Sequence, residues 1–360
     1  MRFYAPLNVV TLLIAFTGLS LFASSSYSAS KEEGKFFGAK MTEYPDWFKE
    51  SFLDLPDDIN EAKESGKRIV LFFHQDGCPY CNALVERNLA QKAIAEKVKN
   101  NFDIIGLNMW GDRTITYVNG KQYSEKNLAE GLKVQFTPTM LFYDEKGKIV
   151  LRLNGYRSPT KFNVDLDYVL ARKTQKVKYL DFIKANLPVT KSSKKLHSED
   201  FFVSSPTNFQ KYTSNNKLSA AFFEQKDCPD CDTLHTKVLP DSTLRKIISN
   251  FKVAQLDMWS KTKVITPQGK TTTAKEWAKD LDIKFAPSIV IFNEKGEEII
   301  RTEGSFKVFH TQGIFDYVLS GAYKKQPSFQ RYLTERADHI REQGKDVDIW
   351  NYANQNPGTR

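Results

Sequence analysis

Four cysteines in two matching spacings are the residues best suited to carry chemistry in this chain. Cys78-Pro-Tyr-Cys81 and Cys228-Pro-Asp-Cys231 each come soon after an apolar run. If each motif joins a strand to a helix, its first thiol lies at the helix N-terminus, where free N–H groups and the helix dipole stabilise a thiolate. The second thiol lies one turn further on, so it can resolve a mixed disulfide formed by the first. The spacing predicts two redox-active dithiol pairs.

An inert structural disulfide is the competing interpretation of each motif. In the chain-entropy model, closing a four-residue loop stabilises a protein by only about 2 kcal/mol, against about 5 kcal/mol for a loop as long as the repeat described below. A disulfide that closes such a short loop therefore adds little stability to the fold. This comparison favours redox chemistry.

An internal repeat shows which elements must position the motifs. Residues 70–81 match 220–231 at an offset of 150, and after a one-residue deletion the match continues at 149, where 136–139 pairs with 285–288. Hydrophobic patterns predict the order β-α-β-α-β-β-α in each copy, with the motif at the first strand-to-helix junction. A period of domain size predicts two tandem α/β domains. The expected strands and main helices are 69–73, 83–98, 104–109, 140–143, 149–153 and 162–171, then 218–223, 233–248, 253–258, 289–292, 298–301 and 309–319.

Three further segments of the first copy have a recognisable pattern: Phe72-Phe73 before the first motif, Phe136-Thr-Pro-Thr139, and Gly147-Lys148 leading to Gly155-Tyr156. With these segments the two copies resemble thioredoxin-fold proteins, and in particular exported bacterial thioredoxins of the SoxW type. This resemblance implies a central mixed sheet flanked by helices, a thiol-disulfide oxidoreductase activity without a cofactor, and protein thiols or disulfides as substrates.

The same resemblance assigns a substrate-binding loop to each copy. It implies that Pro138 and Pro287 are cis-prolines, and that Thr137-Pro138 and Ala286-Pro287 face the cysteines and pair with the substrate backbone. Two features depart from the family pattern. Phe72 and Phe222 stand where thioredoxins commonly carry a buried acid, and Gly77 and Asp227 replace the usual Trp before the first cysteine.

Charged and aromatic neighbours distinguish the two motifs. His74 and Tyr80 lie near the first pair, whereas Glu224 and Asp230 lie near the second. Negative charge disfavours a thiolate, which suggests the hypothesis that the second pair is the more reducing. Electrons would then pass from the second site to the first, although two independent sites remain an equally open alternative.

Function classes other than disulfide reduction or isomerisation also stay open. The same motifs serve oxidases that insert disulfides. Cys228, Cys231 and His235 have spacing that suits copper or zinc, but Val85 replaces the histidine in the first copy, so no metal site is predicted. A chaperone-like module that binds substrates around Pro138 and Pro287 is the third alternative.

The N-terminus and the charge balance indicate the compartment and the partners. Arg2, an apolar stretch and a small-residue tract predict a signal peptide over 1–28, with an uncleaved membrane anchor as the alternative. The chain is then exported to the periplasm without stable membrane insertion after cleavage, and needs a membrane electron donor if it is a reductase. The net charge of +9 comes with interleaved acids and no nucleic-acid motif, so no nucleic-acid partner is expected.

Length and composition complete the predicted organisation. The chain has 360 residues, of which 41% are hydrophobic and 26% charged, as in ordinary globular proteins. The predicted divisions are the signal peptide, a thioredoxin-like domain over 40–184, a linker over 185–216, a second thioredoxin-like domain over 217–345 and a polar tail over 346–360.

Overall fold

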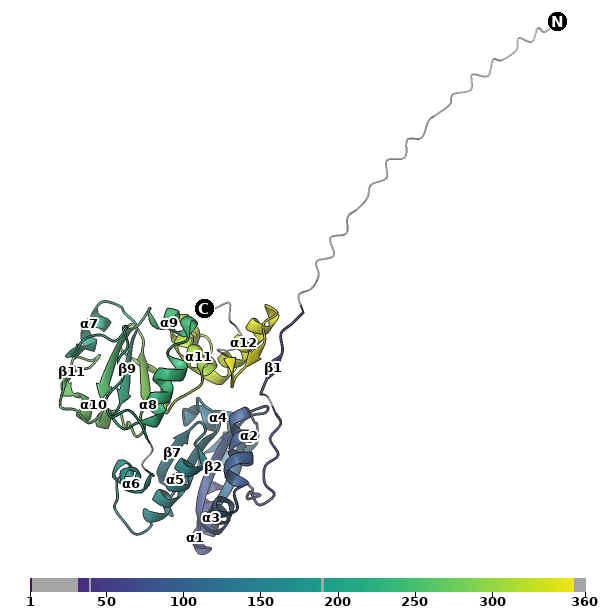
Figure 1. Cartoon of the computed structure of the whole chain (residues 1–360). Coiled ribbons are helices and arrows are strands. Elements are labelled where there is room, and N and C mark those ends of the chain that lie inside the picture. The colour runs from purple at the N-terminus through teal and green to yellow at the C-terminus, as the bar shows by residue number, and fades with distance from the viewer. Residues whose placement is uncertain (2–31, 39, 189–190, 353–360) are drawn as a thin grey trace.

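A computed structural model of the chain describes residues 1, 32–38, 40–188 and 191–352 (Figure 1). The predicted signal peptide lies outside the described residues, apart from Met1. Figure 1 shows two α/β halves, one running from purple to teal and the other mainly green, with the yellow C-terminal helix α12 (Phe329–Glu342) between the second half and the N-terminal strand β1 (Phe36–Phe37). None of the helices among these residues has the length and apolar character needed to cross a membrane.

The first half is built on a four-stranded mixed sheet in the order β3-β2-β6-β7. Strand β2 pairs in parallel with β3 and antiparallel with β6, and β6 pairs antiparallel with β7. The strands run Arg68–His74 (β2), Phe102–Asn108 (β3), Thr139–Tyr143 (β6) and Ile149–Asn154 (β7). The mixed sheet predicted from the sequence is confirmed here.

The second half repeats this arrangement in the order β10-β9-β13-β14. Its strands run Ser219–Glu224 (β9), Lys252–Asp257 (β10), Ser288–Phe292 (β13) and Glu298–Glu303 (β14). Parallel pairing of β9 with β10 and antiparallel pairing of β9 with β13 reproduce the register of the first half. The two copies therefore share one topology.

Helices cover both faces of each sheet, and this explains the continuous apolar runs of the central strands. In β2, Val70 and Phe72 join one hydrophobic cluster, whereas Ile69, Leu71 and Phe73 join the cluster on the opposite face. The helices of the first half are α1 (Leu55–Glu64), α2 (Pro79–Ala83), η1 (Leu84–Leu89), α3 (Lys92–Asn101), α4 (Glu125–Gly131), α5 (Pro159–Ala171) and α6 (Tyr179–Asn186). Those of the second half are α7 (Phe209–Ser214), α8 (Pro229–Thr233), η2 (Leu234–Val238), α9 (Ser242–Ile248), α10 (Ala274–Asp280), α11 (Val308–Leu319), η3 (Ala322–Lys324) and α12.

The prediction of one continuous helix after each motif is wrong. In both copies the α-helix passes into a π-helical turn, and a new helix then begins. In the second copy Pro240 cannot continue the hydrogen-bond ladder, and Asp241 caps α9 by accepting from the Leu244 N–H at 2.8 Å. In the first copy the extended Gln91 (ψ 117°) starts α3.

Short elements occupy two segments that were expected to be irregular. Within the predicted linker, β8 (Thr207–Asn208) pairs with β11 (Lys263–Ile265), which also pairs with β12 (Thr271–Thr273), so 207–214 belongs to the second half. Within the predicted tail, β15 (Val347–Asp348) pairs in parallel with β1. At the position of β11 and β12 the first half has the hairpin β4 (Thr114–Thr116) and β5 (Gln122–Ser124), with a single parallel bridge from Asp54 to Thr116 in place of β8. Strands of only two or three residues carry too little periodicity to be recognised.

Candidate active site

The first cysteine pair forms a disulfide where β2 meets α2. Cys78 is the N-cap residue of α2, and its Sγ accepts a hydrogen bond from the Cys81 backbone N–H at 3.1 Å. Pro79 takes the first helical position, where its missing N–H costs no hydrogen bond. The sulfur that would become the attacking thiolate is thus already oriented toward a helix N–H group, which stabilises negative charge there.

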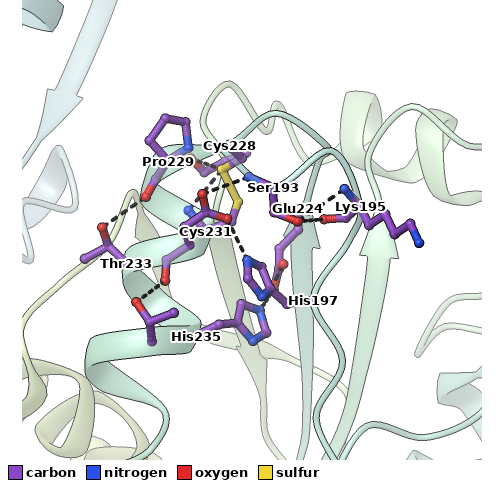
Figure 2. A network of polar contacts seen from close by, with 12 residues as sticks. Ser193, Lys195, His197, Glu224, Cys228, Pro229, Cys231, Thr233 and His235 are labelled. Atoms are coloured by element: carbon purple, nitrogen blue, oxygen red, sulfur yellow. Dashed lines mark hydrogen bonds and ion pairs between the residues drawn. A yellow bond between two sulfur atoms is a disulfide. The ribbon is translucent and has the colours of Figure 1, made fainter. Parts of the chain in front are cut away.

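The second pair forms the equivalent disulfide between β9 and α8 (Figure 2). Cys228 caps α8 and its Sγ accepts from the Cys231 N–H at 3.1 Å. The residues before the two first cysteines share a left-handed backbone, with φ +65° at Gly77 and +53° at Asp227. Glycine adopts this conformation freely, and Asp tolerates it better than a bulky residue does.

A proline loop faces each disulfide, and both Thr137–Pro138 and Ala286–Pro287 are cis peptide bonds. Cys78 Sγ lies 3.4 Å from Thr137 Oγ1, and the other first cysteine has its Sγ 3.5 Å from the carbonyl oxygen of Ala286. These contacts bring together the cysteine and loop residues expected from the sequence. A third cis bond, Ser205–Pro206, was not foreseen.

Tyr80 and His74, which are close to Cys78 in the sequence, lie in different surroundings. Tyr80, inside the motif, packs edge-to-face on His310 of α11 (centroids 5.1 Å apart) and on Trp350 (4.7 Å) of the C-terminal segment. Burial raises the pKa of its hydroxyl above the usual value of about 10. His74, at the end of β2, lies 4.6 Å from the ring of Tyr44, and burial lowers its pKa although nearby acids oppose this.

A buried histidine–carboxylate network lies beneath the second disulfide (Figure 2). His235, one turn after Cys231, places Nε2 3.0 Å from Glu224 and Nδ1 2.8 Å from Glu199. Burial, the largest effect, lowers the pKa of His235, but the hydrogen bonds and charges of the two carboxylates outweigh it and raise the pKa above 6.5. The ring of His197 stacks on His235 at 4.5 Å.

This network bears on the copper or zinc alternative. Both ring nitrogens of His235 are bound to carboxylates, not turned toward the cysteines. Over the described part of the chain, no three His, Cys, Asp or Glu side chains are grouped as metal ligands would be. Glu199 and His197 come from the predicted linker, so the sequence signals only two members of this cluster, His235 by its helical spacing and Glu224 as an acid before the second motif.

Asp230, inside the second motif, forms an ion pair with Lys161 of α5 in the first half. Glu224 is likewise paired, since it accepts from Gln255 at 3.1 Å as well as facing His235. The acidic character attributed to the second site from sequence is therefore offset by partners that the sequence did not indicate.

Two disulfides at helix N-termini, each faced by a cis-proline loop in a mixed α/β domain, define a thiol-disulfide oxidoreductase of thioredoxin fold. The chain belongs to the thioredoxin-like family: the family described as "Thioredoxin-like domain" matches residues 55–170 and 206–318, together more than half of the chain. These two matches fall on the two halves described above.

Individual relatives resemble parts of the chain. The thiol:disulfide interchange protein DsbD of Photorhabdus laumondii subsp. laumondii is 27% identical over 112 residues, which are 30% of this chain and 17% of that protein. A thioredoxin-fold protein from Helicobacter pylori aligns with TM-score 0.31 and 15% identity over 41% of this chain and 91% of its own. A thioredoxin from Thermus thermophilus aligns with TM-score 0.28 and 22% identity over 34% and 87%. The chain thus spans only a small part of the DsbD protein that it matches.

Proposed function

We propose that the protein is an exported oxidoreductase that reduces or isomerises disulfides in other proteins, using both cysteine pairs. In each cycle the thiolate of Cys78 or Cys228 attacks a substrate disulfide and forms a mixed disulfide, releasing one substrate thiol. Cys81 or Cys231 then attacks the mixed disulfide and releases the second thiol. Two electrons and two protons pass to the substrate, and the enzyme pair becomes the disulfide seen here.

One observation carries this proposal. Each first-cysteine sulfur accepts a helix N–H hydrogen bond while lying within 3.5 Å of its proline loop. A nucleophilic sulfur so placed is both activated and positioned beside backbone that can pair with an extended peptide. Thr137, Pro138, Ala286 and Pro287 are the residues proposed to hold that peptide. The four neighbours His74, Tyr80, Glu224 and Asp230 are proposed to tune reactivity.

The reducing direction requires electrons from outside the chain. A membrane-bound dithiol donor on the periplasmic side would supply them, and the predicted signal peptide would place the protein there. The name of the relative that shares 112 residues, a thiol:disulfide interchange protein, supports exchange with other thiol proteins. No cofactor is needed, because the sulfur atoms carry the electrons.

The proposal is tested by a redox titration of two variants that each keep one pair, Cys78→Ser/Cys81→Ser and Cys228→Ser/Cys231→Ser. Each is equilibrated with glutathione buffers, and the free thiols are alkylated and counted by mass spectrometry. Potentials at or below about −200 mV support a reductase or isomerase. Potentials near about −120 mV would instead identify an oxidase that inserts disulfides.

Mixed-disulfide trapping tests the assigned roles of the cysteines. Cys81→Ser and Cys231→Ser leave the attacking thiol without its resolving partner, so covalent complexes with substrate proteins accumulate. The matched controls Cys78→Ser and Cys228→Ser retain only the second cysteine at the altered site, without the attacking thiol, and are expected to trap nothing at that site. A chaperone-like function would leave substrate binding intact in the variant that lacks all four cysteines.

A further inference from the structure

The two halves meet through the same positions of the repeat. Glu303 lies 149 positions after Asn154, so the two residues are equivalent in the two copies. Asn154 Nδ2 donates a hydrogen bond to Glu303 Oε2 at 2.7 Å. Contact between equivalent positions is the mark of a two-fold axis in an isologous interface. The halves are therefore arranged around an internal pseudo-two-fold axis.

Aromatic contacts on both sides of this axis are reciprocal. Phe136, just before the first cis-proline dipeptide, packs on Phe329 of the second half with centroids 5.5 Å apart. Its equivalent, Phe285, packs on Tyr179 of the first half at 5.3 Å. Phe136 is only 5% and Phe285 only 7% exposed, and each belongs to the hydrophobic core of the opposite half.

The residue before the second cysteine of each motif also contacts the opposite half. Tyr80 contacts His310, and the equivalent Asp230 pairs with Lys161. His310 and Lys161 are also equivalent, at the offset of 149. Each active-site helix thus touches the same point of the opposite half, although the side chains have diverged.

These contacts cover the surfaces that surround the two disulfides. The covered segments in each half are the motif, the loop before the cis-proline and the end of one strand, β7 in the first half and β14 in the second. In this arrangement Cys78 is 1% and Cys228 4% exposed. A cavity of about 640 Å³ remains between the halves, with Cys78 and Thr137 in its wall. This volume suits a small molecule, not a folded protein.

Backbone pairing between the two ends of the described chain also holds the halves together. Strand β1, which precedes the first half, pairs with β15 after the second, and Arg341 of α12 donates to the Gly34 carbonyl at 2.9 Å. Gln330 of α12 also donates to the Gln135 carbonyl at 3.1 Å. The first site is therefore covered by the C-terminal segment as well as by the core of the second half.

We propose that each half occupies the substrate-binding face of the other, so that the closed protein admits small disulfides to the first site, through the cavity beside Cys78, but excludes protein disulfides until the halves separate. This inference rests on the proposed oxidoreductase function and names the substrate class available to the closed form. The exchange itself is unchanged: two electrons pass from the enzyme dithiol to the substrate disulfide, and a small dithiol such as dithiothreitol regenerates the enzyme.

The test compares a variant at the axis with a matched one away from it. Asn154→Asp keeps the side-chain shape but places a carboxylate against Glu303. Asn208→Asp makes the same change at the N-cap of α7, where Asp accepts the helix N–H equally well. Two assays at pH 8 are run on each: dithiothreitol-driven reduction of insulin, and oxidation of the reduced enzyme by 2,2′-dithiodipyridine, a small disulfide without charge.

We expect Asn154→Asp to reduce insulin about tenfold faster than the wild type and Asn208→Asp, with rates toward the small disulfide within twofold in all three. The double variant Asn154→Asp/Lys161→Glu adds a second repulsion, against Asp230, and is expected to show a larger radius of gyration in small-angle X-ray scattering. Insulin rates equal to the Asn208→Asp control in both variants, or equal acceleration toward both disulfides, would overturn the inference. A wild type unable to exchange with the small disulfide would instead reject the oxidoreductase function itself.

Discussion

Replacement of His235 by leucine is expected to lower the free energy of unfolding of the second half by about 3 kcal/mol. The imidazole joins two carboxylates, Glu224 and Glu199, beneath the second disulfide. Leucine fills the space but leaves Glu224 as a buried charge without its cationic partner. The loss therefore comes from an uncompensated carboxylate and not from a cavity.

The magnitude follows from burial and from the partners that remain. The His235 and Glu224 side chains are 2% and 0% exposed. Breaking a buried ion pair by removing one member costs about 3–5 kcal/mol. Glu224 keeps the hydrogen bond from Gln255 at 3.1 Å, which places the expected loss at the lower end.

Urea unfolding measures this loss. With a slope of about 2 kcal/mol per molar urea, a loss of about 3 kcal/mol lowers the midpoint by about 1.5 M. The double variant Glu224→Gln/His235→Leu removes the buried charge as well and should recover most of the loss. His339→Leu is the matched control, because that side chain is 73% exposed, and its midpoint should stay within about 0.2 M of the wild type.

The pH dependence gives an independent check. Since the folded pKa of His235 is raised above 6.5, the stability contributed by the protonated ring is complete below pH 6.5 and is lost as pH rises through the folded pKa. The deficit of His235→Leu should therefore be larger at pH 6 than at pH 9. A midpoint within 0.3 M of the wild type at pH 6, or equal deficits at both pH values, would refute the reasoning.

Two further predictions concern the contacts that differ between the sites. Lys161→Met leaves the Asp230 carboxylate unpaired near Cys228, so the reduction potential of the second disulfide should fall by about 10 mV. Glutathione titration measures this shift, with the first disulfide as internal control. An unchanged potential of the second disulfide would contradict the prediction. Trp350→Ala uncovers Tyr80, and mass spectrometry of labelled thiols should show the first disulfide reduced several-fold faster by a reduced dithiol protein of thioredoxin size. The second disulfide should keep its wild-type rate, and acceleration of both would show that the effect is not local.

The sequence predicts the parts of this fold that arise from strong periodicity and from repetition. The apolar runs 69–73 and 218–223 became β2 and β9 because both faces of a central strand are buried. The disulfide sites followed from cysteine spacing alone. The interruption after each motif was missed because the helical pattern continues through the π-helical turn, and only Pro240 marks the break in the second copy.

The neighbours of the second site were harder to predict because their effect depends on partners distant in the chain. The sequence shows Glu224 and Asp230 as two negative charges, whereas in the structure His235 and Lys161 offset them. Lys161 lies in the other half, 69 positions from Asp230. Local sequence shows which charges are near a thiol but not which of them are neutralised.

Divergence of the two copies has kept the geometry of the interface while changing its chemistry. Around the first site the contact joins two neutral rings, since burial lowers the pKa of His310 to about 4 and raises that of Tyr80. At the equivalent position around the second site the contact is the ion pair between Asp230 and Lys161. Salt screens a partly exposed ion pair but leaves an apolar ring contact nearly unchanged. The two catalytic faces are thus held closed by different forces. Added salt weakens the contact that covers the second disulfide but not the contact that covers the first.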